Sequence, residues 1–230
     1  MKERNLRYNH LIAECLVIAL VATLLVSLTP WCKRIPIFSE PAFAQGKLEI
    51  FWDRRARFSI SYPSSWHIIT GEETQSLVKK SVDEYDLFES LKEEIRQSPG
   101  PRVYIFKEPM GAGVEFNPNI NVLVQEVPAN IVVPTGQVLI DHLKNSLEMY
   151  LKGFNLISAK EITLHSLPAV VLDYTYKMPI GDKEQSLRSL QYNIIVKNRF
   201  MYTLSATDMV SNFRKNKAEF ESILNSFQFK

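Results

Sequence analysis

Histidines are the first residues to consider for chemistry, because histidine both transfers protons near neutral pH and binds metals. Beyond residue 44 there are three of them: His67, His142 and His165. Asp141 precedes His142 in a segment with helical spacing. Asn145 and Glu148 share a helix face with Asp141 but not with His142. A solvated helix face therefore explains these residues better than a metal site does.

Serine and glycine motifs give no catalytic constellation either. Ser64 and Ser65 lie in an expected turn beside Trp66, and no acid is placed to orient a nearby histidine. Gly111-Ala112-Gly113 resembles part of a phosphate-binding loop, but no helix follows to offer its amides. The chain has no Gly-x-Ser-x-Gly, His-Glu-x-x-His or Cys-x-x-Cys motif. The sequence thus predicts no catalytic, cofactor-binding or metal-binding residue, and we interpret Trp66 as a core anchor.

The first 44 residues predict export. A basic start precedes an apolar run from Cys15 to Leu28, and Ala42-Phe43-Ala44 has the small-x-small pattern of a signal-peptidase site. As a helix, the run spans only ~21 Å, less than the ~30 Å hydrocarbon core of a bilayer. We therefore expect cleavage between Ala44 and Gln45. An uncleaved membrane anchor is the alternative, because sixteen residues separate the run from the cleavage site.

Removal of this leader changes the composition of the chain. Both cysteines, Cys15 and Cys32, lie within it, so the mature domain must be held by its core and not by disulfides. The precursor has 27 Lys plus Arg and 25 Asp plus Glu, and the leader holds five and three of these. The mature chain therefore has 22 of each and no net charge. A neutral chain gives no support to a nucleic-acid partner.

The remaining 186 residues, 45–230, fit a single domain. Alternating apolar and polar residues and flanking turn residues predict strands in most of it. The expected strands cover 58–62 with a continuation at 66–69, then 103–106, 119–127, 154–164, 169–177, 189–196 and 200–207. Apolar residues at helical spacing predict helices at 135–153, at 213–227 and at 83–96. Thr135 is the expected N-cap of the first of these helices and Gly153 its C-terminal cap. This order predicts an α+β fold, an antiparallel β-sheet sandwiched by amphipathic helices.

Several blocks in this order resemble the PsbP-like family, whose fold is shared by the extrinsic photosystem II protein PsbP and the Ran-binding Mog protein. The resemblance rests on an opening strand ending in Pro and Trp, an N-x-N-V-x-V-like strand, a hairpin, a last strand and a closing F-x-x-I-L-x-S-F. In this sequence these blocks are 58–66, 119–124, 164–176, 200–207 and 220–227. Ser166 stands where the family usually has Gly, and residues 72–100 read as an inserted helical segment.

The resemblance implies an exported, non-enzymatic accessory protein, located in the periplasm or, in a photosynthetic source, in the thylakoid lumen near photosystem II. Its partner would be a protein at the outer face of the cytoplasmic or thylakoid membrane. Calcium is the one cofactor that the family would allow. Charged residues of the insertion are the candidate partner contacts: Glu89, Lys92, Glu93, Glu94 and Arg96.

A second class of function remains open, that of an extracytoplasmic module that binds a small ligand or a metal between the sheet and the inserted segment. Such a module would place polar residues, for example Tyr174, Tyr176 or Gln191, inside a cavity. A docking protein would instead expose an apolar patch.

Overall fold

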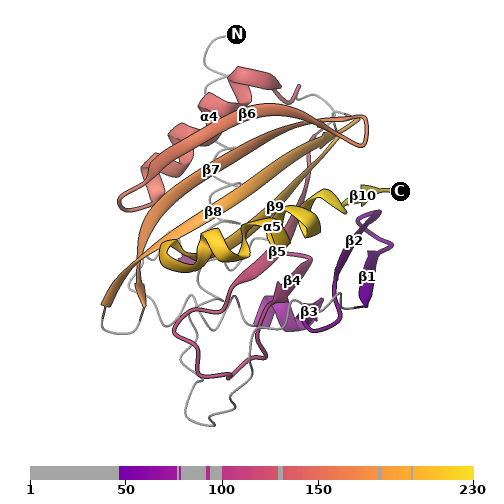
Figure 1. Ribbon diagram of the computed structural model, residues 1–230. Helices are drawn as coiled ribbons and strands as arrows, with labels where there is room; N and C mark the ends of the chain where they lie inside the picture. Colours follow the sequence, from indigo (N-terminus) through magenta and orange to yellow (C-terminus); the bar gives the residue numbers. More distant parts are fainter. Residues whose placement is uncertain are drawn as a thin grey trace.

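The computed structural model describes residues 47–76, 78, 92–93, 100–128, 132–180, 183–197 and 199–230. Strands dominate this part of the chain, and two helices, α4 and α5, are described over their full length (Figure 1). The elements are β1 (Leu48–Asp53), β2 (Phe58–Pro63), β3 (His67–Thr70), β4 (Val103–Phe106), β5 (Asn119–Glu126), α4 (Gly136–Tyr150), β6 (Asn155–Leu164), β7 (Leu167–Ile180), β8 (Lys183–Val196), β9 (Phe200–Met209), α5 (Val210–Asn225) and β10 (Gln228–Phe229).

The strands form two antiparallel sheets. Seven of them make a large sheet in the order β3-β4-β5-β9-β8-β7-β6, and the other three make a small sheet in the order β1-β2-β10. Strands β6 to β9 follow one another as a meander, in which β7 and β8 have 14 residues each. The predicted α+β class is therefore confirmed.

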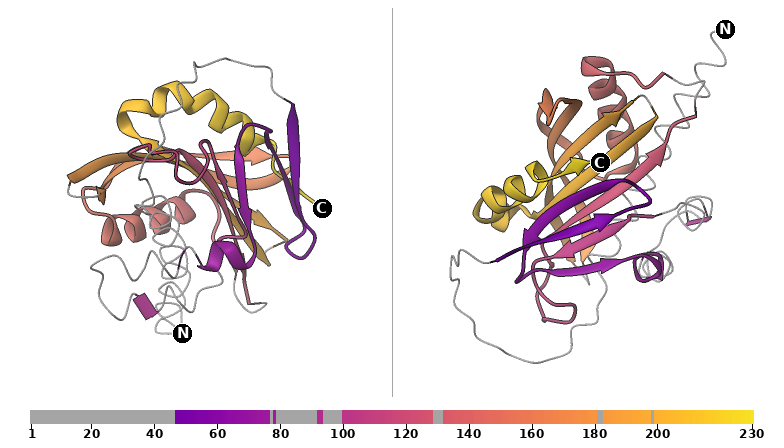
Figure 2. Two further views of the ribbon diagram at one scale, coloured as in Figure 1. Left: turned by 90° about the horizontal axis from the view of Figure 1, so that it is seen from below. Right: turned by 90° about the vertical axis from the view of Figure 1, so that its right-hand side faces the viewer.

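The two helices cover opposite faces of the large sheet, as the left view of Figure 2 shows. Helix α5 packs on β8 and β9 and also contacts β2, whereas α4 packs on β6 and β7. The small sheet lies at the side of this sandwich, where β10 brings the end of the described chain next to β2. The first and the last described strands therefore lie in the same sheet, on either side of β2.

The core between α5 and the sheets is rich in aromatic side chains. The stripe predicted for the C-terminal helix is buried, and its Phe213 and Phe220 are fully buried. The Phe58 ring stacks on the Phe227 ring with centroids 5.6 Å apart, and the Tyr202 ring centroid lies 5.2 Å from that of Phe227. Because these rings come from β2, β9 and the residues after α5, their contacts join the small sheet to the large one.

The predicted continuation of the first strand at 66–69 is wrong. The Trp66 amide donates a hydrogen bond to the Pro63 carbonyl at 2.9 Å, which closes a turn. The chain then enters β3 at the edge of the large sheet, whereas β2 belongs to the small sheet. Trp66 itself is 4% exposed, so its prediction as a core residue is confirmed.

The ends of α4 match the caps predicted from the sequence only in part. Thr135 occupies the N-cap position, but its side chain makes no capping hydrogen bond. Gly153 follows the helix with φ +64°, a left-handed conformation that glycine adopts without strain. The hairpin expected at Ser166-Leu167-Pro168 turns one residue earlier, because His165 and Ser166 both have positive φ and β7 already begins at Leu167.

Only the beginning and a short middle piece of the proposed insertion 72–100 are described. Residues 72–76 are helical, and the buried Thr74 hydroxyl donates hydrogen bonds to the carbonyls of Gly71 and Pro101. Val78 is buried in the same core cluster as the residues of α4. Most of the predicted helix 83–96 lies outside the described residues, and so do the expected cleavage site Ala44–Gln45 and the rest of the leader. Within the described ranges, no helix is long and apolar enough to cross a membrane.

Candidate docking surface

The most exposed apolar strand of the described chain is β1. Its alternate side chains Leu48, Ile50 and Trp52 point away from the core and are 62%, 62% and 49% exposed. The opposite face of the strand carries Phe51, which packs against the Phe58 ring, and the buried Asp53. Since β1 is the edge strand of the small sheet, the stripe is open to solvent on its face and at its edge.

Five exposed basic side chains surround the end of this stripe. They come from the β1–β2 turn, the β8–β9 turn and the C-terminal residue: Arg54, Arg55, Arg57, Lys197 and Lys230. Lys230 Nζ lies 5.5 Å from the Trp52 ring centroid, whereas Arg57 and Lys197 both lie over the Phe229 ring. None of the five forms a salt bridge with another described residue. We call the three apolar and five basic residues together the β1 patch.

A buried ion pair holds the turn of the β1 patch in place. The Asp53 carboxylate accepts hydrogen bonds from the Arg55 and Ala56 amides at 2.9 and 2.8 Å and from Arg102 Nε at 2.7 Å. Burial opposes ionisation of this carboxyl group, but the hydrogen bonds and the Arg102 charge outweigh it and lower the pKa of Asp53. The only acid of the turn is thus neutralised by Arg102, so the arginines of the turn keep their positive charge uncompensated.

The second notable group is a row of polar side chains inside the domain. They lie on the face of the large sheet opposite α5, on β5, β7, β8 and β9, and none is more than 5% exposed. The polar row consists of Asn119, Asn121, Tyr174, Tyr176, Ser189, Gln191, Asn193, Thr203, Ser205 and Thr207.

Most groups of the polar row pair with one another. The Tyr174 hydroxyl donates to Gln191 Oε1 at 2.9 Å, and Asn193 Oδ1 accepts from Gln191 Nε2 and from Thr203 Oγ1, each at 3.1 Å. Two donors, the Tyr176 hydroxyl and Asn193 Nδ2, are buried without a hydrogen-bond partner. Burial raises the pKa of the Tyr176 phenol, and the nearby hydroxyls of Ser189 and Thr207 offset this only in part. Unpaired buried donors are rare in folded proteins, and an internal water or a small ligand would satisfy them.

The histidines and acids that the sequence offers as candidate catalytic or metal-binding residues do not lie close together in the structure. His67 lies on β3, His142 on α4 and His165 in the β6–β7 turn, where its Nε2 contacts the Asn225 carbonyl oxygen at 2.9 Å. Asp141 accepts a hydrogen bond from Gln137 on its own helix, as expected of a solvated face. No group of three His, Cys, Asp or Glu side chains that could hold a metal occurs in the described ranges. The expectation about calcium stays a prediction.

The partner contacts predicted in the insertion are largely outside the described residues. Glu89, Glu94 and Arg96 are among those not described. Lys92 and Glu93 are helical, with Lys92 partly buried and Glu93 exposed. Their role in binding stays a prediction.

Sequence reasoning missed β1 altogether. The signal was weak, since only Leu48-Glu49-Ile50 alternates and Phe51 and Trp52 are both apolar. Leu48, Ile50 and Trp52 face outward, and in the sequence an edge strand with an apolar outer face resembles any half-buried strand. Only the structure distinguishes the two faces.

Comparisons with known proteins agree with this fold. A family model, PsbP, matches residues 46–229. The solution structure of the cyanobacterial PsbP protein CyanoP from Synechocystis sp. PCC 6803 is similar over 85% of this chain and 99% of its own, with 15% identity and a TM-score of 0.53. LpqN of Mycobacterium tuberculosis, described as involved in cell envelope biogenesis, covers 82% of this chain and 87% of its own, with 14% identity and a TM-score of 0.49. No curated protein matches the sequence. The family model spans both hydrophobic cores and all the strands described here, and the chain therefore belongs to the PsbP family.

Proposed function

We propose that this protein is an exported, non-enzymatic accessory protein that works at the outer face of a cytoplasmic or thylakoid membrane by docking on a membrane or envelope complex. The observation that carries the proposal is the β1 patch. An open edge strand with three exposed apolar side chains, beside five cations that form no salt bridge with any residue the structure describes, is a surface suited to contact with a partner. In a photosynthetic source, we expect the complex to be related to photosystem II.

Two further features support a role in docking. The mature chain has no net charge, so the cations of the β1 patch give the domain a charged end and not a uniform field. The proposed protein contacts of the insertion would form a second, separate surface around Glu93. The proposal involves no cofactor, and equilibrium dialysis against calcium would test that part of it.

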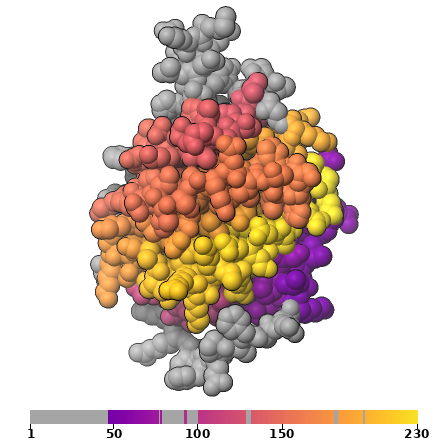
Figure 3. Space-filling view, turned by 45° about the horizontal axis from the view of Figure 1, so that its top comes forward, coloured from indigo at the N-terminus to yellow at the C-terminus, as the bar shows by residue number. Residues whose placement is uncertain are grey.

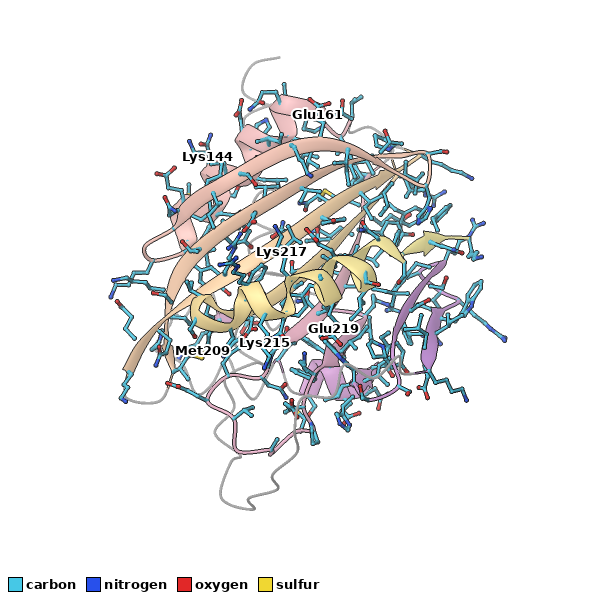
Figure 4. All side chains as sticks on the ribbon, viewed as in Figure 1. Lys144, Glu161, Met209, Lys215, Lys217 and Glu219 are labelled. Atoms are coloured by element: carbon cyan, nitrogen blue, oxygen red, sulfur yellow. The ribbon has the colours of Figure 1, made fainter. Side chains whose placement is uncertain are left out.

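Site-specific photocrosslinking in the native host tests the proposal directly. A photoreactive amino acid at Ile50 or at Glu93 should give discrete crosslinked products in the envelope fraction. The same group at Lys144 on the outer side of α4 (Figure 4) is the control and should give none. Equal product patterns at all three positions, or no product at any of them, would contradict docking.

The polar row favours a second candidate, the binding of a small neutral polar molecule inside the domain. Its groups are all uncharged, and the Tyr176 hydroxyl and Asn193 Nδ2 offer two unpaired donors. Native mass spectrometry of the gently purified protein tests this candidate. A stoichiometric extra mass that is lost in a Tyr176→Phe variant would support it, and the bare chain mass would contradict it.

A further inference from the structure

We propose that the β1 patch binds the surface of an anionic lipid bilayer, so that the lipid itself holds one end of the domain on the membrane. This inference rests on the proposed function for its location and names the partner of the same surface. It follows from the kind of side chains present, their direction, their area and their charge.

The apolar part of the β1 patch is shaped for shallow insertion. Leu48, Ile50 and Trp52 project from the same side of one strand at intervals of about 7 Å, so all three can enter a planar interface together. Tryptophan prefers the membrane–water interface, and amphipathic surfaces bury their apolar side chains only ~5–10 Å deep. This depth is within the reach of side chains that stand on an edge strand.

The basic part supplies attraction to anionic headgroups. Arg54, Arg55 and Arg57 follow the stripe in the chain, and Lys230 lies over the Trp52 ring. Lys197 lies over the Phe229 ring, at the same end of the small sheet but on its other face. Figure 3 shows the C-terminal residues, in yellow, beside the indigo residues of the small sheet, so the two ends of the sequence contribute to one surface. Each basic residue near an anionic membrane contributes about 1 kcal/mol, or a factor of about five in binding. Long Arg and Lys side chains also reach headgroups while their stems stay on apolar surface.

Area and charge argue against a protein partner or a second copy of the chain as the sole occupant of this surface. From the exposed fractions, the three apolar side chains offer on the order of 300–400 Å², about half of what one partner gives to a standard protein interface. A second copy of the chain would place five cations against five cations across a two-fold axis. A bilayer needs no matching shape and tolerates a small patch.

The place of β1 in the chain points the same way. It is the first described element after the predicted export signal, and nineteen residues separate Leu28, the end of the apolar run, from Leu48. If that run is retained, it keeps β1 near the bilayer by a short tether. If it is cleaved, the β1 patch is what remains to hold the domain there.

Vesicle binding of the chain from Gln45 to Lys230 tests the inference. The described residues of this part contain both cores, and CyanoP aligns over 99% of its own length, so the fold needs nothing from the leader. We expect flotation with vesicles of phosphatidylcholine mixed with phosphatidylglycerol, no flotation with phosphatidylcholine alone, and weaker binding at high salt. Equal binding to both kinds of vesicle, or to neither, would overturn the inference.

Matched variants localise the contact. Arg54→Gln with Arg55→Gln should lower the partition coefficient about 25-fold, the product of two factors of about five. Lys144→Gln with Lys215→Gln removes the same charge from α4 and α5 (Figure 4) and should change it less than about twofold. Ile50→Ser with Trp52→Ser should lower it roughly tenfold or more. All six positions are exposed, so each variant should unfold like the parent. Loss of binding in the control pair would mean that only overall charge matters, and would overturn the inference.

Intrinsic fluorescence gives a readout at the site itself. In this chain only Trp52 and Trp66 remain, and Trp66 is buried. A blue shift of the emission with anionic vesicles, with quenching by brominated lipid, would therefore report insertion of Trp52, and an unchanged spectrum would contradict it.

If vesicles fail to bind while crosslinks from Ile50 to an envelope protein persist, the lipid inference fails and the docking function stands. If vesicles bind and no protein crosslinks form, the lipid inference stands and the docking function fails.

Discussion

Two neighbouring tyrosines of β7 have opposite energetic roles. The Tyr174 hydroxyl donates to Gln191, whereas the Tyr176 hydroxyl is buried without a partner. Removal of the Tyr176 hydroxyl therefore takes away a desolvated donor and costs only its contacts with the Ser189 and Thr207 hydroxyls, which already bond to each other. We expect Tyr176→Phe to leave the free energy of unfolding unchanged or to raise it by up to about 1 kcal/mol. Urea unfolding followed by circular dichroism measures this change.

Tyr174→Phe is the matched control, since it has the same burial and the same atom removed. It should lower the free energy of unfolding by about 1–2 kcal/mol, because Gln191 Oε1 loses its donor. If Tyr176→Phe costs as much as Tyr174→Phe, the Tyr176 hydroxyl has an acceptor in solution. That result would favour the ligand-binding candidate.

Asp53 governs the turn that presents the arginines of the β1 patch. Asp53→Asn removes the charge that pairs with Arg102 and weakens two backbone contacts, so we expect a loss of about 1–2 kcal/mol near neutral pH. Glu126→Gln, at the exposed pair with Arg199, is the control and should cost less than about 1 kcal/mol.

The pH dependence of the Asp53 effect has a defined sign. Because the pKa of Asp53 is lowered in the folded protein, its contribution is fully present above the unfolded value of about 3.9. It is lost as the pH falls through the folded value. The difference between wild type and Asp53→Asn should thus be constant above about pH 5 and shrink below pH 4. A difference that persists unchanged in acid would show that the Asp53 charge is not involved.

At the scale of elements, the start of α4 depends on a glycine and on a carboxylate from another strand. Gly136 has φ +61°, and a Cβ placed there would lie 2.6 Å from Glu161 Oε1 of β6. Figure 4 shows Glu161 beside this end of the helix. Its negative charge lies near the helix N-terminus, where the Thr135 side chain provides no cap.

Gly136→Ala should therefore destabilise the domain by more than the backbone strain of an alanine at positive φ. Gly71 has nearly the same φ, +63°, with nothing within 4 Å of its Cβ position, so Gly71→Ala measures the strain by itself. We expect about 1 kcal/mol for Gly71→Ala and about 1 kcal/mol more for Gly136→Ala. In a Glu161→Ala background, the extra cost should disappear. Equal costs for the two glycines in the wild-type background would mean that the carboxylate moves aside freely.

Much of the element order was predictable, and the exceptions have physical causes. The strands 103–106 and 119–127 follow runs of strand-forming residues between turn residues, and the stripe around Phe220 follows helical spacing. The assignment of β2 and β3 to different sheets was not predictable, because it depends on the turn after Pro63 and on pairing with β10, more than 160 residues away. The outward direction of Trp52 depends on the same pairing, so the β1 patch was not predictable either.

At the scale of the whole molecule, the polar row shows a second limit of sequence reasoning. Thr203, Ser205 and Thr207 alternate with apolar residues along β9 and share the less apolar face of that strand. Their polarity does not distinguish a solvated face from a covered one, and the structure buries them beside Asn193 and Gln191 from β8. Burial of polar residues follows from what packs over a sheet, which is a property of the complete fold.

The export of the whole molecule is the last prediction. The family match begins at residue 46 and β1 at Leu48, so cleavage after Ala44 would leave every described element intact. We expect intact-mass analysis of protein from the native host to give a chain that starts at Gln45. Ala44→Phe should block cleavage and accumulate the precursor in the membrane fraction, because signal peptidase requires a small residue there. Phe43→Leu, at the variable middle position, is the control and should be processed normally. If native protein keeps Met1 to Leu28 and sediments with membranes, the leader is an anchor, and the β1 patch then acts beside it and not in its place.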